Sequence, residues 1–260
     1  MTRPLSVTPD HDVGSTDRRL ELVWNFRMAG TELPAWRWPE QGLPPLEQLQ
    51  PVRIPRSSNR HRHIPVTAYS TVNIDFVQLE SGLEHDLLRR VDRDPTVRGI
   101  LAQPLRLSWT GSSAGYHIPD LLTWHGDQSV TVWDARATED QDEDFQRAVA
   151  VTARACELVG WRHEVFTGLG QVERLNLLWL QGFRRRPLWA DDYEVQIRAV
   201  AAGPRVSLGD LFARDDGSGQ LIAVVWHWIW RGILQIDLQS PWGLDTMVGL
   251  SDTRIGDPHG

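Results

Sequence analysis

The chain has 260 residues, of which 41% are hydrophobic and 13 are tryptophan, so it encodes a folded protein of one large or two small domains. Its net charge of −7 argues against strong, independent binding to bare DNA. All 27 of its Lys and Arg residues are arginine, and the single Cys156 excludes an internal disulfide. No run approaches the roughly 18 apolar residues of a membrane helix, and Met1 to Pro4 begin no signal peptide. We therefore expect a cytoplasmic protein without a membrane segment.

The N-terminal part lacks a clear periodic pattern. Residues 1–20 are polar and predict a disordered tail. Residues 21–55 mix short apolar runs with a stretch rich in proline and tryptophan. We interpret residues 1–55 as an extension that lies over a domain surface without a core of its own. Basic residues then gather in 53–63, where the candidates for DNA contacts are Arg56, Arg60 and Arg62.

Residues 76–166 have the pattern of a compact α/β core. Leucines from Leu79 onward follow helical spacing up to Asp94-Pro95, which ends the predicted helix. Cys156 lies in a second predicted helix, where a buried thiol is the favoured interpretation. The expected order is αβββαβ, with strands at 99–109, 116–124, 129–136 and 161–166, and with the second helix at 142–159 after the acidic run 139–144.

The C-terminal part predicts helices followed by a hairpin. Helices are expected at 173–183, 190–202, just after Ser207 and at 220–231, and strands at 233–238 and 245–250. This is the order of a winged-helix domain, although many small α+β domains share it. For Trp226, Trp228 and Trp230, core packing or a partner surface is favoured over base stacking. Arg184 to Arg186, with Arg184 and Arg185 as DNA-binding candidates, fit either a phosphate-facing patch or a helix C-terminus.

Three acidic residues fall on neighbouring predicted elements. Asp120 in His117-Ile118-Pro119-Asp120-Leu121 and Asp134 are expected near the ends of adjacent strands, with Glu84 on the preceding helix. Their carboxylates can converge on one divalent cation, and Arg136 should share a strand face with Asp134 because side chains alternate with period two. Such hard oxygen ligands suit Mg²⁺ or Mn²⁺, which polarises a phosphodiester and activates water.

Each of these residues also has an ordinary structural interpretation. Asp120 could be a polar strand end, and Asp134 could cap the next turn. Glu80 competes with Glu84 because it lies one helical turn away on the same face. Histidines near the site are expected to contact phosphate or solvent instead of a metal; these are His61, His63 and His117.

Longer motifs resemble the TnsA-like endonuclease subunit of heteromeric bacterial transposases. They are Ser58-Asn59-Arg60-His61 with Tyr69-Ser70, Glu80-Ser81-Gly82-Leu83-Glu84, Asp94-Pro95-Thr96-Val97, Gln103-Pro104-Leu105 and Tyr116-His117-Ile118-Pro119-Asp120-Leu121-Leu122. The resemblance implies a nuclease domain of the restriction-enzyme type, at 56–168, and a winged-helix-like domain at 169–260. It also implies cleavage of the 5′ transposon ends, beside a DDE-type transposase that cuts and joins the 3′ ends and an ATP-dependent transposition regulator.

Carried over by position, the resemblance makes Glu84 and Asp120 metal ligands and Asp134 a third acid or ligand. Arg136 stands where that family usually has lysine, and the chain has no lysine that could replace it. Arginine can neutralise a phosphate but cannot act as a base, because its pKa exceeds about 12. The predicted function is a magnesium-dependent DNA endonuclease subunit. The alternatives are a catalytically weakened scaffold that binds DNA ends or the transposase, and a stand-alone restriction-type nuclease.

Overall fold

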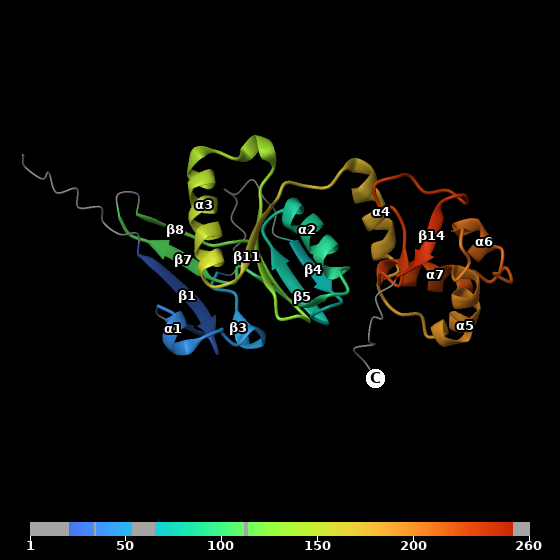
Figure 1. The fold of residues 1–260 in the computed structure, drawn as a ribbon, viewed down its shortest axis with the longest axis horizontal. Coiled ribbons are helices and arrows are strands. Elements are labelled where there is room, and N and C mark those ends of the chain that lie inside the picture. Colours follow the sequence, from blue (N-terminus) through green and yellow to red (C-terminus); the bar gives the residue numbers. More distant parts are fainter. Residues whose placement is uncertain (1–20, 34, 54–65, 112–113, 252–260) are drawn as a thin grey trace, which may run out of the picture.

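The computed structural model describes residues 21–33, 35–53, 66–111 and 114–251. The predicted tail at 1–20 lies outside these ranges, and so do Arg56, Arg60, Arg62, His61 and His63. Within the described residues the protein is a mixed α/β structure. Figure 1 shows the larger sheets with α2 and α3 in one part, the helices α5 to α7 in another, and α4 between the two.

The N-terminal segment is part of the first sheet and its core. Strand β1 (Leu22–Met28) pairs antiparallel with β7 (Arg106–Trp109), and Trp24 and Phe26 are buried against Leu107. The other strands of this sheet are β2 (Thr31–Leu33), β3 (Leu49–Gln50) and β8 (Gly115–His117). The strand order is β2-β1-β7-β8, and β3 also pairs with β1. Helix α1 (Trp38–Gln41) lies between β2 and β3 in the chain. This corrects the expectation of a surface extension: Trp24 and Phe26 alternate with the less buried Val23, Asn25 and Arg27, and they face inward.

The second sheet carries the candidate site. Its order is β11-β10-β9-β6, from β6 (Val97–Ala102), β9 (Leu121–His125), β10 (Val130–Ala135) and β11 (Arg162–Phe166). Only the β10–β11 pair of this sheet is parallel, and α3 (Glu143–Leu158) makes the crossover. Helix α3 begins at its N-cap Asp142, with Glu143 and Asp144 in the first turn, which confirms the acidic run as a helix start.

The two faces of β10 pack against different helices. Val132 packs with Cys156 of α3, and Cys156 is fully buried as expected. Trp133 packs instead with Leu87 of α2 (Gly82–Asp92), in a cluster that includes the hairpin β4 (Val66–Ser70) and β5 (Asp75–Leu79). Adjacent residues of β10 therefore face opposite layers.

Two predicted strands are each interrupted. The strand expected at 99–109 divides into β6 and β7 around Gln103-Pro104, and the strand expected at 116–124 divides into β8 and β9 around Pro119-Asp120. Proline supplies no N–H for a strand ladder, and Gln103 has a left-handed φ of +49°. Both breaks lie beside the candidate site.

The C-terminal part is helical with a small antiparallel sheet. It contains α4 (Gln171–Gln181), α5 (Ala190–Ala201), α6 (Leu208–Phe212) and α7 (Gln220–Trp230), and the sheet has the order β12-β14-β13, from β12 (Val206–Ser207), β13 (Leu234–Gln235) and β14 (Met247–Leu250). Ser207 and Asp210 form the predicted capping interaction. Trp226, Trp228 and Trp230 are all buried, which confirms core packing. No described helix combines the length and apolar character needed to cross a membrane.

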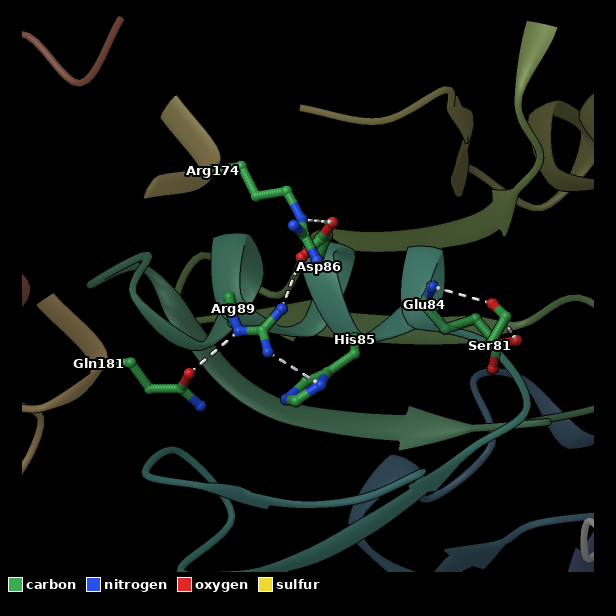
Figure 2. Close-up of polar contacts among 7 residues, drawn as sticks. All are labelled: Ser81, Glu84, His85, Asp86, Arg89, Arg174 and Gln181. Atoms are coloured by element: carbon green, nitrogen blue, oxygen red, sulfur yellow. Dashed lines mark hydrogen bonds and ion pairs between the residues drawn. The ribbon is translucent and has the colours of Figure 1, made fainter. Parts of the chain in front are cut away.

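A polar network joins α2 to the C-terminal part (Figure 2). Asp86 pairs with Arg89 on its own helix and accepts a hydrogen bond from Arg174 Nε of α4 at 2.7 Å. Arg89 Nε donates to Gln181 Oε1 at 3.0 Å. At the C-cap of α2, Arg93 donates to the Ile229 carbonyl of α7 at 2.9 Å. These contacts hold α2 and the C-terminal helices together.

Candidate functional site

Glu84 lies in the first turn of α2, where the sequence forms a capping arrangement (Figure 2). The Ser81 hydroxyl accepts from the Glu84 backbone N–H at 3.1 Å and donates to Glu84 Oε1 at 2.9 Å. The Glu80 backbone N–H donates to Glu84 Oε2 at 2.9 Å. Burial raises the pKa of Glu84, and the negative charge of Glu80 adds to this rise. Glu80 itself is partly exposed and pairs with Arg53. Of the two competing acids, Glu84 is the buried one.

Asp120 is held at the point where β9 begins beside the end of β10. Its Oδ2 accepts from the Ala135 backbone N–H at 2.7 Å, and its own N–H donates to the Trp133 carbonyl at 2.9 Å. Burial raises the pKa of Asp120 well above its ordinary value, and the nearby charges of Glu84 and Asp134 raise it further. Negative charge therefore accumulates around Asp120, and a bound cation would relieve this repulsion.

Asp134 has a different environment although it is on the neighbouring strand. His117 Nε2 donates to its Oδ1 at 2.7 Å, and His163 Nε2 donates to its Oδ2 at 2.8 Å. The carboxyl group is almost fully buried. Burial alone would raise the pKa of Asp134, but the two imidazole hydrogen bonds outweigh it, so this pKa is lowered. Both carboxylate oxygens are already occupied by protein donors.

The three carboxylates expected to converge on one cation therefore have different environments. Asp134 has the same strand parity as Val132, which faces α3, and its charge helps to raise the pKa of the buried Cys156 thiol of α3 to about 12, mainly an effect of burial. Glu84 belongs to α2, on the other layer. Among the described residues, no group of three or more His, Cys, Asp or Glu side chains could hold a metal ion. Asp120 is electrostatically linked to both Glu84 and Asp134, but of these two acids only Asp134 accepts hydrogen bonds from histidines.

Arg136 follows the end of β10 and turns toward the start of α3. Its Nε donates to the Asp140 carbonyl at 2.9 Å, and its guanidinium lies 5.4 Å from the centre of the Phe145 ring. Arg136 and Asp134 thus both face the α3 layer, as the period of two predicts. The side chain is 44% exposed, and its described contacts include Asp142 but not Glu84 or Asp120. A phosphate could therefore reach it from solvent.

Gln103 is a polar residue that sequence reasoning did not assign to the site. Its backbone N–H donates to the Asp120 carbonyl at 2.9 Å, and its side chain is only 1% exposed. Neither its amide nitrogen nor its amide oxygen has a hydrogen-bond partner among the described residues. An orphaned buried amide and a left-handed φ are both costly, and both are typical of functional positions. The signal in the sequence is a glutamine before Pro104, between two apolar runs.

The two arginines predicted to bind DNA and described by the structure, Arg184 and Arg185, lie just past the end of α4. Arg184 Nη1 donates to the Gln181 carbonyl at 2.7 Å, so this residue closes the C-terminus of the helix, as the structural alternative predicted. Arg185 is exposed, and its guanidinium lies 5.7 Å from the centre of the Tyr69 ring of β4. The second arginine remains free to meet an anionic partner.

No protein-family model matches the chain, and no curated protein matches it. The resemblance to TnsA-like endonucleases therefore rests on the motifs in the sequence.

Proposed function

We propose that this protein is a metal-dependent DNA endonuclease, the subunit of a heteromeric bacterial transposase that hydrolyses phosphodiesters at the 5′ transposon ends. The observation that carries the proposal is the Glu84–Asp120 pair: burial raises the pKa of Asp120, and the nearby charge of Glu84 raises it further. A strand-capping aspartate has no need of a second buried acid nearby. Two such acids suit the handling of a cation, and the exposed Arg136 on the α3 side of the sheet is available to a phosphate.

The described residues fit a magnesium or manganese site built from two carboxylates. Magnesium in proteins keeps several waters and is bound through one or two carboxylates together with substrate phosphates, so a cage of three protein acids is not required. Asp120 and Glu84 would hold the ion, and Gln103, whose backbone N–H donates to the Asp120 carbonyl, carries an unpaired buried amide oxygen. Asp134 is left out of this pair because its strand parity directs it to the α3 layer, where His117 and His163 donate to its carboxylate. When bound, such an ion polarises a phosphodiester and lowers the pKa of water.

The residues of the chain would supply orientation and charge. The Ala135 N–H fixes Asp120, and Ser81 with the Glu80 N–H fixes Glu84 before any ligand arrives. The unpaired amide of Gln103 can hold a buried water in place. Arg136 can neutralise the scissile phosphate but cannot accept a proton.

The wider assignment follows from the same resemblance. The order α2-β6-β9-β10-α3-β11 supports a restriction-endonuclease-like core, although β7 and β8 intervene to join the first sheet. Helices α5 to α7 followed by β13 and β14 support a winged-helix-like C-terminal domain. The proposed partners are transposon-end DNA, a DDE-type transposase and an ATP-dependent transposition regulator, in the cytoplasm.

The sharpest test compares two glutamates four residues apart, Glu80 before α2 and Glu84 in its first turn. Glu84→Gln removes the buried acid and keeps its size, and Glu80→Gln makes the same change at the partly exposed position. Cleavage of transposon-end DNA would be measured with magnesium and with the partner transposase. We expect Glu84→Gln to lose cleavage and Glu80→Gln to keep most of it. The stabilisation of the protein by magnesium, measured as a shift in Tm, should disappear in the same variant.

Full cleavage by folded Glu84→Gln would mean that the site is misplaced. Equal losses in the two variants would point to the charge of the region and not to a ligand at Glu84.

A second candidate, a scaffold that binds DNA ends or the transposase without cutting, is favoured by two observations. Arginine replaces the lysine that the family usually has, and Asp134 is bound to histidines. If the natural protein and both glutamate variants are inert with transposase and magnesium, yet transposition still requires the chain, the scaffold is the better description.

A further inference from the structure

A cleft lies between the β4–β5 hairpin and the C-terminal helices. Its volume is about 500 Å³. Tyr69, Thr71 and Ile74 of the hairpin region form one wall. The opposite wall comes from the loop after α4, from α5 and from the end of α7. We call it the arginine cleft, after the five arginines that line it: Arg184, Arg185, Arg186, Arg198 and Arg231.

The arginine cleft is positively charged although the whole chain carries −7. Its lining includes one acid, Glu194, which already pairs with Arg198 at 2.9 Å. Arg186 pairs with Asp191, and both of these pairs are exposed, so they are weak and exchangeable. Arg185 and Arg231 have no carboxylate partner among the described residues. The pKa of His227 in the lining is lowered, first by burial and then by Arg231 and Arg186, which agrees with a positive field.

The chemistry of the lining suits a string of phosphates. Guanidinium groups bind phosphate oxygens in a two-pronged manner, and several arginines in one cleft match several anions in a row. A duplex carries one negative charge per roughly 1.7 Å of its axis, whereas a small anion would use only one or two of the five arginines. A concentrated basic surface is also what an acidic protein needs in order to hold DNA.

Helix α2 links the arginine cleft to the carboxyl pair. Glu84 lies in its first turn, and Asp92 at its end lines a smaller cavity of about 120 Å³ that shares Thr71, Ile74 and Arg231 with the cleft. Eight residues of helix span roughly 12 Å, which is about the length of three to four base pairs. The contacts of α2 with α4 and α7 keep this spacing fixed.

We infer that the arginine cleft binds the phosphate backbone of duplex DNA. The bound phosphates lie roughly three to four base pairs or more from the bond that is cut. The inference rests on the proposed function for its choice of DNA. In this inference the β4–β5 hairpin region and the C-terminal helices both contribute to DNA binding. Arg185 and Arg231 are the arginines most available for phosphate.

The test is the salt dependence of DNA binding by the full chain. Binding of a fluorescent DNA duplex would be titrated without magnesium at salt concentrations from about 50 to 200 mM. The test variant is Arg185→Gln with Arg231→Gln. The matched control is Arg147→Gln with Arg154→Gln, which removes the same charge from exposed positions on α3. Far-ultraviolet circular dichroism and Tm would establish that each variant is folded.

We expect the cleft variant to lower the slope of log affinity against log salt by about 1.8, which corresponds to two lost phosphate contacts, and to weaken binding at least tenfold at the lower salt. The α3 control should match the natural chain. Arg185→Lys with Arg231→Lys should retain the slope, because it retains the charge. If Arg231→Gln prevents folding, the exposed Arg185→Gln alone should lower the slope by about 0.9.

An unchanged slope in the folded cleft variant would overturn the inference, as would equal losses in the α3 control. Failure of the natural chain to bind duplex at low salt would do the same. Competition by polyglutamate that is stronger than competition by unlabelled duplex would identify an acidic protein partner instead. DNA binding is measured separately from cleavage. A chain that does not cut DNA but shows the expected salt dependence of binding would therefore refute only the proposed function. Cleavage that depends on Glu84 but not on the cleft arginines would refute only the cleft.

Discussion

Asp120 and Asp134 lie on neighbouring strands, yet their environments shift their pKa values in opposite directions. Around Asp120, burial and the charges of Glu84 and Asp134 raise the pKa. Around Asp134, hydrogen bonds from His117 and His163 lower the pKa in spite of burial. Asp120 therefore lies among negative charges, whereas Asp134 accepts hydrogen bonds from two histidines of the protein itself. Proximity in a sheet therefore does not make two acids equivalent; the partners on each face decide their roles.

The largest expected effect is that of Asp120→Asn on catalysis. Loss of a partner outside the first ligand shell costs about 10- to 100-fold, so removal of a charged ligand should cost at least about 100-fold in magnesium-dependent cleavage. The same change should stabilise the metal-free protein. Because the folded pKa of Asp120 is raised, the folded state loses stability as pH rises from the ordinary value of 3.8 through the raised pKa, and asparagine removes this loss.

Cleavage rate and Tm with and without magnesium would check both effects. Asp127→Asn, at an exposed turn, is the matched control. A folded Asp120→Asn chain that is less stable than the natural one at neutral pH would contradict the proposed charge accumulation.

Asp134→Ala should have the opposite effect on stability. It leaves two largely buried imidazole donors without an acceptor, at a cost of about 2–4 kcal/mol in the free energy of unfolding. Because the folded pKa of Asp134 is lowered, its contribution is fully present above the unfolded pKa and is lost as pH falls through the folded value. Urea unfolding at neutral and acidic pH would measure this. If Asp134→Ala and Asp120→Asn shift stability in the same direction, the contrast between the two acids does not hold.

Substitutions at Arg136 test whether the α3 side of the sheet, which carries Asp134 and Arg136, takes part in catalysis. Arg136→Lys keeps the positive charge and adds a group that can lose a proton, so we expect it to retain or raise cleavage. Arg136→Ala should lose most of the activity. Cleavage would be assayed with transposase and magnesium, beside the control Arg147→Ala on α3. Equal, robust activity in Arg136→Ala would show that phosphate neutralisation comes from elsewhere.

Gln103→Met should have the smallest effect of the four. Methionine has a similar length without amide groups, so it removes an orphaned polar group from a buried position and should leave stability unchanged or slightly raised. Cleavage should fall about tenfold, as expected for a residue that orients a ligand or water. Tm and cleavage rate measured on the same sample would separate these effects. Unchanged cleavage would leave Gln103 as a structural residue of the strand break.

Several features followed from local patterns in the sequence. The helices near 82–92 and 143–158, the capping pair Ser207 and Asp210, and the strand after Gly160 all depend on spacing over a few residues, which the chain displays directly. The choice of Glu84 over Glu80 as the buried acid also agrees with its place in the family motif. The prediction that residues 21–33 belong to a surface extension was wrong. The partner of β1 is β7, about 80 residues away, and no local pattern specifies such a pairing.

The sequence by itself determined the α/β class, the net negative charge and the absence of lysine. It also placed Asp134 and Arg136 on the same strand face, because side chains alternate in any strand. Only the tertiary structure decided which layer each acid faces. It gave both oxygens of Asp134 to His117 and His163, brought Glu84 within electrostatic reach of Asp120, and gathered arginines from three separate segments into one cleft. These are contacts between residues distant in the chain, and their energies depend on burial and on neighbours that the order of residues does not reveal.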